Sequence, residues 1–322
     1  MSLEESVDQR KIISAEKWFG IHRATCAKID ELRKQKARDP PRIKIALLDS
    51  GIDLSDFHKD EINQPVDVKF RSWVGDPSVR EDDAGYGTHL AYLLREIAPN
   101  AEIHVGRIFK KRPSIKKSAD VIAEAIYHCV DVWEVDMIVM SFGFGEEDSG
   151  IYQSIKYAAS KDVIMFAAAC NDGTNRSDGF AWPAKDSNVI CVHSADGDGT
   201  PSTFTPSPQD GMRVMVLGEC VDSAWPPKFK SNKNRKLMSG TSCAAPIAAG
   251  IAAVLLDFAK GILSDEDMRR LHRTTSIQRL FRKISNPHGG YHWVRHWSLF
   301  DSGGQVNLDW IKGEIQGALN NR

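Results

Sequence analysis

IKIALLDSGID, which runs from Ile43 to Asp53, is the most informative stretch for the fold class. Its first six residues form a short, mainly apolar run, as expected for a strand that is buried on both faces. An acidic turn follows directly after the run. Strands of this kind belong to parallel sheets that are covered by helices on both sides, so the stretch predicts an α/β domain.

The rest of the chain repeats this alternation as far as about residue 260. Five further apolar runs predict strands: Glu102–Ile108, Met137–Met140, Val163–Ala169, Val189–Val192 and Val214–Val216. Four segments between or after them have helical periodicity: His89–Ile97, Ser118–Trp133, Gly150–Ser160 and Ser242–Phe258. The pattern predicts a three-layer α/β/α fold with a mainly parallel central sheet over residues 41–260. Residues 1–40 are expected to form an N-terminal helical segment, and residues 261–322 a C-terminal helical extension.

Composition excludes several classes of protein. The 322 residues carry a net charge of −1, which gives no electrostatic reason to expect nucleic acid or an anionic membrane as a partner. The N-terminus has no apolar core of a secretory signal, and the apolar runs are too short to span a bilayer. The six cysteines are scattered and form no CxxC pair, so reduced thiols and a cytoplasmic location are expected.

Four short segments carry residue types that are typical of catalysis. Asp49 follows the first strand, where ligand crevices form in open α/β sheets. His89 lies in the first turn of a helix, after two glycines and a threonine. Asn171 ends a buried strand, from which its amide can donate to an oxyanion. Ser242 opens an apolar helix whose free N–H groups stabilise negative charge. Each segment alone is also common in ordinary turns and helix caps.

Their order along the chain is far more specific than any one of them. The succession Asp, His, Asn, Ser, each in its local motif, resembles the subtilase family of serine peptidases over about residues 41–260. The resemblance implies that Ser242 is the nucleophile, His89 the general base and then acid, and Asp49 the group that orients His89. It also implies that Asn171 and the Ser242 backbone N–H hold the oxyanion, with a weaker contribution from Thr241.

The resemblance extends to the substrate. Ser141, Phe142 and Gly143 resemble the segment against which subtilases pair an extended peptide. The walls of the P1 pocket are expected to include these three residues on one side, and Ala168, Ala169 and Cys170 on the other. Asp172 is expected at the rim of this pocket, where an acid favours a basic or polar P1 residue.

Two cysteines depart from the family pattern. Cys170 stands where a glycine is usual, and is expected to narrow the P1 pocket or to shift its strand. Cys243 follows the nucleophile where methionine is frequent, and its thiol is expected to be open to oxidation. Neither change removes a member of the triad.

No cofactor and no metal are expected. Calcium is common in the family, but the chain has no dense loop of carboxylates with a ligand pattern. Asp53, Asp56, Asp82 and Asp83 are therefore interpreted as turn and surface acids. The expected partner is a polypeptide substrate. Short cytosolic subtilases of this build resemble those of fungal defence systems, which suggests a gasdermin-like protein as the substrate and control by a partner domain, an oligomer or a trigger.

Two other functions compete with a serine endopeptidase. A catalytically silent module with this fold would capture extended peptides without cleaving them. An esterase of the α/β-hydrolase type would need a G-x-S-x-G elbow, whereas the serine context here is Ser239-Gly240-Thr241-Ser242 and the order of the triad differs.

Overall fold

The fold is built on one nine-stranded sheet with strand order β10-β11-β7-β6-β5-β4-β1-β3-β2. The computed structural model describes residues 8–34, 41–54, 68–111, 114–173, 180–209, 211, 213–231, 234–301 and 307–320. The strands of the sheet are β1 (Lys44–Asp49), β2 (Val68–Ser72), β3 (Glu102–Arg107), β4 (Met137–Met140), β5 (Ile164–Ala168), β6 (Val189–Ala195), β7 (Val214–Leu217), β10 (Ser285–His288) and β11 (Tyr291–Val294). Every pairing except β10–β11 is parallel, which confirms the predicted mainly parallel sheet.

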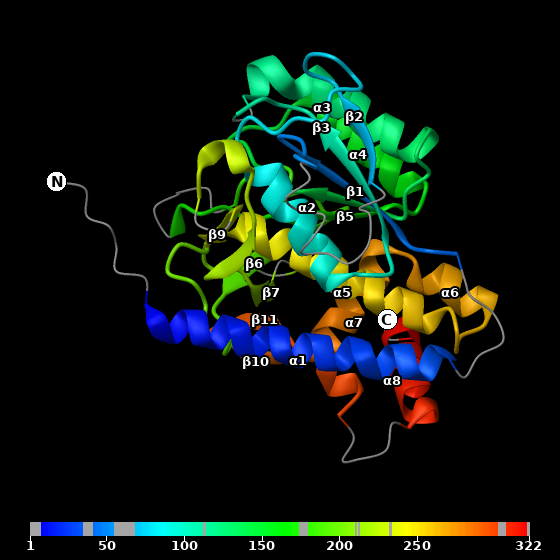
Figure 1. Cartoon of the computed structure of the whole chain (residues 1–322). Helices are drawn as coiled ribbons and strands as arrows, with labels where there is room; N and C mark the ends of the chain where they lie inside the picture. The colour runs from blue at the N-terminus through cyan, green and yellow to red at the C-terminus, as the bar shows by residue number, and fades with distance from the viewer. Residues whose placement is uncertain are drawn as a thin grey trace.

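Helices cover both faces of this sheet (Figure 1). On one face lie α2 (Tyr86–Ile97) and α5 (Thr241–Ala259), and on the other lie α3 (Ile115–Asp131) and α4 (Ser149–Ser160). In β1, Ile45 and Leu47 belong to the first core, whereas Ala46 and Leu48 belong to the second. This alternation explains why the strand is apolar at successive positions: both of its faces are buried.

Helix α5 lies in the middle of the molecule because its residues are small. A Cβ atom on Gly250 would come within 2.5 Å of Ile97 Cγ2, so α2 and α5 pack closely only because this position is glycine. By length and composition α5 could cross a membrane, but 94% of its most apolar window is buried inside the protein. It is the core helix of the domain.

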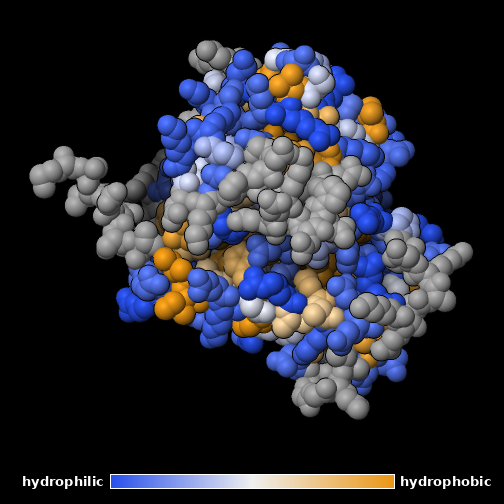
Figure 2. All heavy atoms as spheres, in the orientation of Figure 1, coloured by the Kyte–Doolittle hydropathy of each residue, from blue (hydrophilic) through white to orange (hydrophobic). Residues whose placement is uncertain are grey.

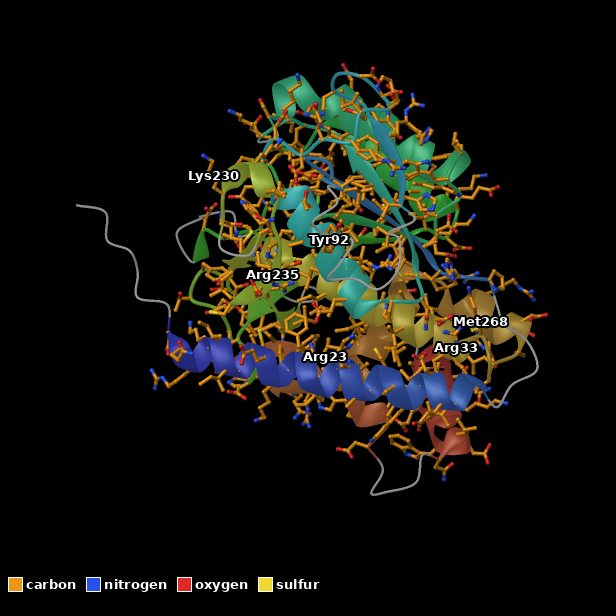
Figure 3. All side chains as sticks on the ribbon, viewed as in Figure 1. Arg23, Arg33, Tyr92, Lys230, Arg235 and Met268 are labelled. Carbon is orange, nitrogen blue, oxygen red and sulfur yellow. The ribbon has the colours of Figure 1, made fainter. Side chains whose placement is uncertain are left out.

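Helix α1 (Gln9–Lys34) lies across the outside of the α2–α5 layer. In Figure 1 it runs across the lower part of the molecule, and Figure 3 shows Arg23 and Arg33 at separate points along it. Arg23 pairs with Glu96 of α2 at 3.0 Å, and Arg33 pairs with Asp257 of α5 at 2.7 Å. The helix therefore braces both central helices at their C-terminal ends.

A buried pair of histidines fixes the middle of α1. His22 Nδ1 lies 2.8 Å from His296 Nε2, and His22 Nε2 lies 2.9 Å from the carbonyl oxygen of Ile97. Burial lowers the pKa of His22 to about 4 and that of His296 well below its usual range, so both rings are neutral. Since the Ile97 carbonyl can only accept, His22 donates from Nε2 and accepts from His296 at Nδ1.

The C-terminal segment differs from the predicted helical extension. It contains α6 (Asp265–Leu271), α7 (Thr274–Lys283), the 3₁₀ turn η5 (His296–Leu299) and α8 (Leu308–Asn320), but its β10–β11 hairpin also extends the central sheet beyond β7. A second hairpin, β8 (Val221–Ala224) with β9 (Arg235–Met238), stands apart from the sheet. Figure 2 shows that the described surface in this view is mainly hydrophilic, with hydrophobic residues in small groups.

Candidate active site

The predicted motifs meet at the carboxyl edge of the sheet. Asp49 ends β1, Ser141 follows β4, and Asn171 lies just beyond β5. Ser242 is the second residue of α5, and His89 lies in the first turn of α2. Ligands bind at this edge in open α/β sheets, because strand ends and helix N-termini converge there.

The backbone of Ser242 is anchored through an unusual helix feature. Pro246 lies inside α5 and has no N–H, so it leaves the carbonyl four residues earlier without its helical donor. That carbonyl belongs to Ser242, and the Ser141 hydroxyl donates to it at 2.9 Å. The Ser141 side chain therefore supports the candidate nucleophile and is not free for substrate.

The amide of Asn171 has a fixed orientation. Its Oδ1 accepts from the Thr241 backbone N–H at 2.8 Å and from the Thr241 hydroxyl at 2.9 Å. The Thr241 hydroxyl in turn accepts from the Cys170 backbone N–H at 3.3 Å. Because both contacts of Oδ1 are with donors, Nδ2 is the group left to donate into the site. Thr241 thus acts on the site by orienting Asn171.

An open space beside Gly240 lies between the Ser242 hydroxyl and the Asn171 amide. A Cβ atom built on Gly240 would stand 2.9 Å from Ser242 Oγ and 3.2 Å from Asn171 Nδ2. The glycine leaves room for an oxygen atom that is close to both the hydroxyl and the amide donor. An amide donor this close to a candidate nucleophile is what an oxyanion hole needs.

Asp49 is buried, and among the described residues its carboxylate accepts hydrogen bonds from Ser50 alone. Its Oδ1 accepts from the Ser50 backbone N–H at 2.8 Å and from the Ser50 hydroxyl at 3.1 Å. Burial raises the pKa of Asp49 to about 7, and the nearby Asp82 carboxylate adds to the rise, while the bonds from Ser50 oppose it. A cationic or donating partner at its other oxygen would bring this pKa down again.

His89 makes no hydrogen bond with Asp49 or Ser242 among the described residues. Its Nε2 faces the backbone carbonyls of Lys236 at 3.0 Å and Val221 at 3.3 Å, so Nε2 carries the proton. Its Nδ1 is buried without a hydrogen-bond partner in the described part of the chain. Burial lowers the pKa of His89 to about 4, so the ring is neutral. The triad chemistry needs the opposite tautomer, with Nδ1–H directed at Asp49.

The β8–β9 hairpin and Trp225, which follows β8, pack against His89. The Ser223 hydroxyl donates to the His89 carbonyl at 2.9 Å, and the Trp225 ring packs edge-on to the imidazole with ring centroids 6.4 Å apart. A Cβ on Gly85, at the start of α2, would clash with Trp225 at 2.6 Å. The Lys236 ammonium lies over the Trp225 ring, 4.0 Å from its centroid. Hairpin and helix are thus joined around the candidate base.

The interpretation of Asp82 as a surface acid is wrong. The structure buries it completely, and its carboxylate accepts from the Ser50 hydroxyl, from the Thr88 hydroxyl and from the backbone N–H groups of Ala84, Gly85 and Thr88. It fixes the N-terminus of α2 to the end of β1, where negative charge is favoured.

The other three acids of that group are not buried where the structure describes them. Asp53 is partly buried, and its backbone N–H donates to the Thr88 hydroxyl at 3.0 Å. Asp83 is half-buried and forms an ion pair with the buried Arg107 at 2.7 Å. Asp56 lies outside the described residues. Within the described ranges, no group of three or more His, Cys, Asp or Glu side chains could hold a metal ion.

The structure shows the surroundings of both cysteines. Cys170 has φ +149°, a conformation that suits glycine, and its thiol bends back to donate to Asp172 at 3.3 Å while accepting the Asp172 backbone N–H at 3.1 Å. Cys243 is completely buried, and burial raises its pKa to about 12. The expectation that Cys243 is open to oxidation is therefore wrong, because the thiol is protonated and inaccessible.

Two of the predicted walls of the P1 pocket lie in the core. Phe142 and Ala169 are buried among the residues on the α3–α4 side of the sheet. Their place in the walls of the P1 pocket therefore stays a prediction. Both follow a strand whose neighbours cover the two faces, so a position next to the edge was not enough to expose them.

The remaining predicted substrate residues differ in their exposure. Gly143 and Asp172 are exposed and Ser141 is half-buried, whereas Ala168 and Cys170 are buried. Ser141 and Gly143 make no backbone hydrogen bond within the described ranges. Their backbone groups are available to pair with an extended peptide, as β-augmentation requires.

Comparison with known proteins identifies the family of this fold. The model of the subtilase family matches residues 41–292, which is most of the chain. The chain belongs to the subtilase family. Its relatives are named as serine proteases, and the chain is a subtilisin-like serine endopeptidase.

Individual relatives are distant in sequence. The chain is 28% identical to an intracellular serine protease of Paenibacillus polymyxa over 67% of each protein. It is 28% identical to the subtilisin-like protease het-Q2 of Podospora anserina over 56% of this chain and 51% of that protein. Among solved structures, a mutant of the protease domain of PatA has a TM-score of 0.63 at 22% identity, with 88% of this chain and 98% of that one covered. This last likeness shows the fold.

Proposed function

We propose that the chain hydrolyses peptide bonds by an acyl-enzyme mechanism with Ser242, His89 and Asp49 as the triad. His89 Nε2 takes the proton of the Ser242 hydroxyl as Oγ attacks the scissile carbonyl carbon. The resulting oxyanion is held by Asn171 Nδ2 and the Ser242 N–H. The protonated His89 gives its proton to the leaving amine, and a water molecule then repeats the attack to release the acid. Asp49 orients the imidazole and stabilises its positive charge.

One observation carries this proposal: Ser242 Oγ and Asn171 Nδ2 border the same open space. A Cβ atom built on Gly240 would stand 2.9 Å from the first and 3.2 Å from the second. The test is labelling of the purified chain with a fluorophosphonate probe, alongside Ser242→Ala and His89→Ala. The wild type should label and cut a peptide library, and both variants should do neither. A folded wild type that stays unlabelled and binds peptides without cleaving them would support the catalytically silent module instead.

We further propose that the described conformation is a resting state, in which His89 must turn before catalysis. The support is the Nε2 contact with the carbonyls of the β8–β9 hairpin, together with an Nδ1 that has no partner among the described residues. Nitrogen NMR of histidine-labelled protein tests it, with His89→Gln to assign the signal. Free enzyme should show the Nε2–H tautomer, and a fluorophosphonate adduct on Ser242 should show Nδ1–H. Detection of Nδ1–H in the free enzyme would mean that the triad is already assembled.

The biological setting of this activity is a separate proposal. The relatives named as intracellular proteases support a cytoplasmic location. The resemblance to subtilases of fungal defence systems, with the similarity to het-Q2 of Podospora anserina, supports a gasdermin-like protein as the substrate.

The test of this substrate mixes the purified chain with a gasdermin-like protein of the same organism and dye-loaded liposomes. Cleavage and dye release should occur with the wild type and not with Ser242→Ala. An intact gasdermin-like protein beside a cleaved control peptide contradicts the substrate but leaves the peptidase activity standing.

A further inference from the structure

Positive charge is concentrated in one segment of a chain that is nearly neutral overall. Between Asp267 and Asp301 the sequence has four histidines and no Asp or Glu. The same segment holds seven basic residues: Arg269, Arg270, Arg273, Arg279, Arg282, Lys283 and Arg295. Such segregation at a net charge of −1 produces a local positive potential, which the sum over the chain conceals.

Some of these charges are neutralised by acids outside the segment. Arg273 pairs with Asp162 at 3.7 Å, and Lys283 pairs with Glu314 at 3.4 Å. Arg279 and Arg282 are different, because neither side chain has an ion pair or hydrogen bond among the residues that the structure describes. Both lie on the exposed side of α7, whose opposite side is anchored in the core by the apolar residues Ile277, Leu280 and Phe281.

These two arginines line a cavity of about 470 Å³ between α7 and the start of β7. Arg213, Gln278 and His292 contribute to the same lining. Among the described lining residues none is acidic. A volume of this size lies in the range of small-molecule sites, and its lining offers guanidinium and amide donors together.

The ring of His292 adds an independent observation. Its Nδ1 is buried and has no hydrogen-bond partner in the described part of the protein. Burial lowers the pKa of His292, and the guanidinium groups of Arg282 and Arg213 lower it further, so the ring lies within their positive field. The N-terminus of α7 has no side-chain cap, and Thr275 in its first turn lines the cavity, which adds a partial positive charge.

We propose that this cavity binds a small molecule with two or more phosphate groups, of the size of a nucleotide or an inositol phosphate. Arginine forks match phosphate oxygens in pairs, and three arginines here line one space. The cavity lies at Val214, the first residue of β7, whereas Gly218, just after the last residue of β7, accepts the Gly240 N–H at 2.8 Å. The phosphate site and the candidate active site are thus at opposite ends of one strand, and the proposal is independent of the peptidase mechanism.

Calorimetric titration of the full chain tests the proposal, with ATP and inositol hexakisphosphate as probes and sodium sulfate as the control anion. At least one probe should bind with a Kd on the order of micromolar and raise the melting temperature. Arg279→Glu and Arg282→Glu should each weaken binding at least about tenfold. Arg269→Glu is the matched control, because Arg269 belongs to the same basic segment but does not line the cavity.

The outcomes separate the alternatives. Tighter binding of ATP indicates a nucleotide as the source of the phosphates, and tighter binding of inositol hexakisphosphate indicates an inositol phosphate; either supports the site. Equal weakening by Arg269→Glu would mean that charge alone attracts the probe, which overturns the proposal. It is also overturned if neither probe binds better than sulfate, or if an oligonucleotide binds with the same dependence on Arg269 as on Arg279. Melting temperature and peptide cleavage without probe verify that the variants are folded.

Discussion

The two halves of the candidate active site are organised in different ways. Around Ser242, hydrogen bonds fix the Ser242 carbonyl to Ser141 and the Asn171 amide to Thr241. Around His89, the hydrogen bonds hold the ring against the β8–β9 hairpin, and within the described residues no hydrogen bond joins it to Asp49. Under the proposed mechanism, the oxyanion groups are therefore in place, whereas the His89 ring must turn to meet Asp49.

The largest expected effect comes from filling the oxyanion space. Gly240→Ala places a methyl group between Ser242 Oγ and Asn171 Nδ2, so it displaces the oxyanion from both. We expect kcat/KM for a peptide substrate to fall by about 10² to 10³, similar to the loss of an oxyanion donor. Gly313→Ala is the control, because a Cβ there meets no atom within 4 Å. Unchanged activity in Gly240→Ala would show that the oxyanion forms elsewhere.

The second prediction concerns the separation of Asp49 from His89. Because burial raises the pKa of Asp49 to about 7, the folded protein binds a proton that the unfolded chain releases, and stability falls as pH rises from about 4 to 7. The effect of His89 on stability runs the other way. Because burial lowers its pKa to about 4, His89 contributes stability at neutral pH that is lost as pH falls from 6.5 to 4. Asp49→Asn should therefore gain stability relative to the wild type as pH rises, by up to about 4 kcal/mol.

Urea unfolding at about pH 4.5 and about pH 8, on either side of the shifted pKa of Asp49, measures this difference. His89→Gln should show the complementary change and lose less stability than the wild type on acidification. If Asp49→Asn shows the same change in stability between the two pH values as the wild type, the pKa of Asp49 is not raised in the folded protein, and this prediction is wrong.

A double-mutant cycle measures the contact between the Ser141 hydroxyl and the Ser242 carbonyl. Ser141→Ala leaves the Ser242 carbonyl without a donor and should cost about 1–3 kcal/mol of stability, with a drop in kcat. Pro246→Ala restores an N–H that can donate to the same carbonyl. The loss caused by Ser141→Ala should therefore be smaller in the Pro246→Ala background, and additive losses would show that the two residues act separately.

The smallest effect is expected from the strained cysteine. Cys170→Gly places the residue that suits φ +149° at this position and should stabilise the fold by roughly 1 kcal/mol. It also removes the thiol that holds Asp172, so the loop around Asn171 becomes more mobile and kcat should fall a few-fold. Thermal unfolding and peptide hydrolysis measure the two effects. Cys170→Ser, which keeps the strain and a donor, should resemble the wild type in both.

Sequence patterns predicted the elements whose burial is uniform. Strands such as β1 and β5 have apolar residues on both faces, and the motif residues at their carboxyl ends could be placed together for that reason. Strands with mixed faces were missed: β2 is Val-Lys-Phe-Arg-Ser at a sheet edge, and β10 contains Pro287. Their pairing depends on neighbours that local pattern does not reveal.

The same limit applies to the site. The positions of Asn171 and Ser242 follow from a strand end and a helix start, which sequence motifs specify. The direction of the His89 ring follows from two carbonyl groups on a hairpin 132 and 147 residues away in sequence, which no local motif encodes. Asp82 was missed for a related reason, since one of its donors is the Ser50 hydroxyl, 32 residues earlier in the chain.

The histidine pair that fixes α1 also sets an order of events during synthesis. His22 leaves the ribosome early, but its partner His296 is made 274 residues later. At a translation rate of about 5–20 residues per second, roughly 15 to 55 seconds pass between the synthesis of His22 and that of His296, whereas Ile97, Glu96 and Asp257 are made earlier. The histidine pair therefore forms after the partners of the ion pairs between α1 and the two central helices have been made. The middle of α1 reaches its final packing only once residue 296 has left the ribosome, later than every parallel strand of the sheet from β1 to β7.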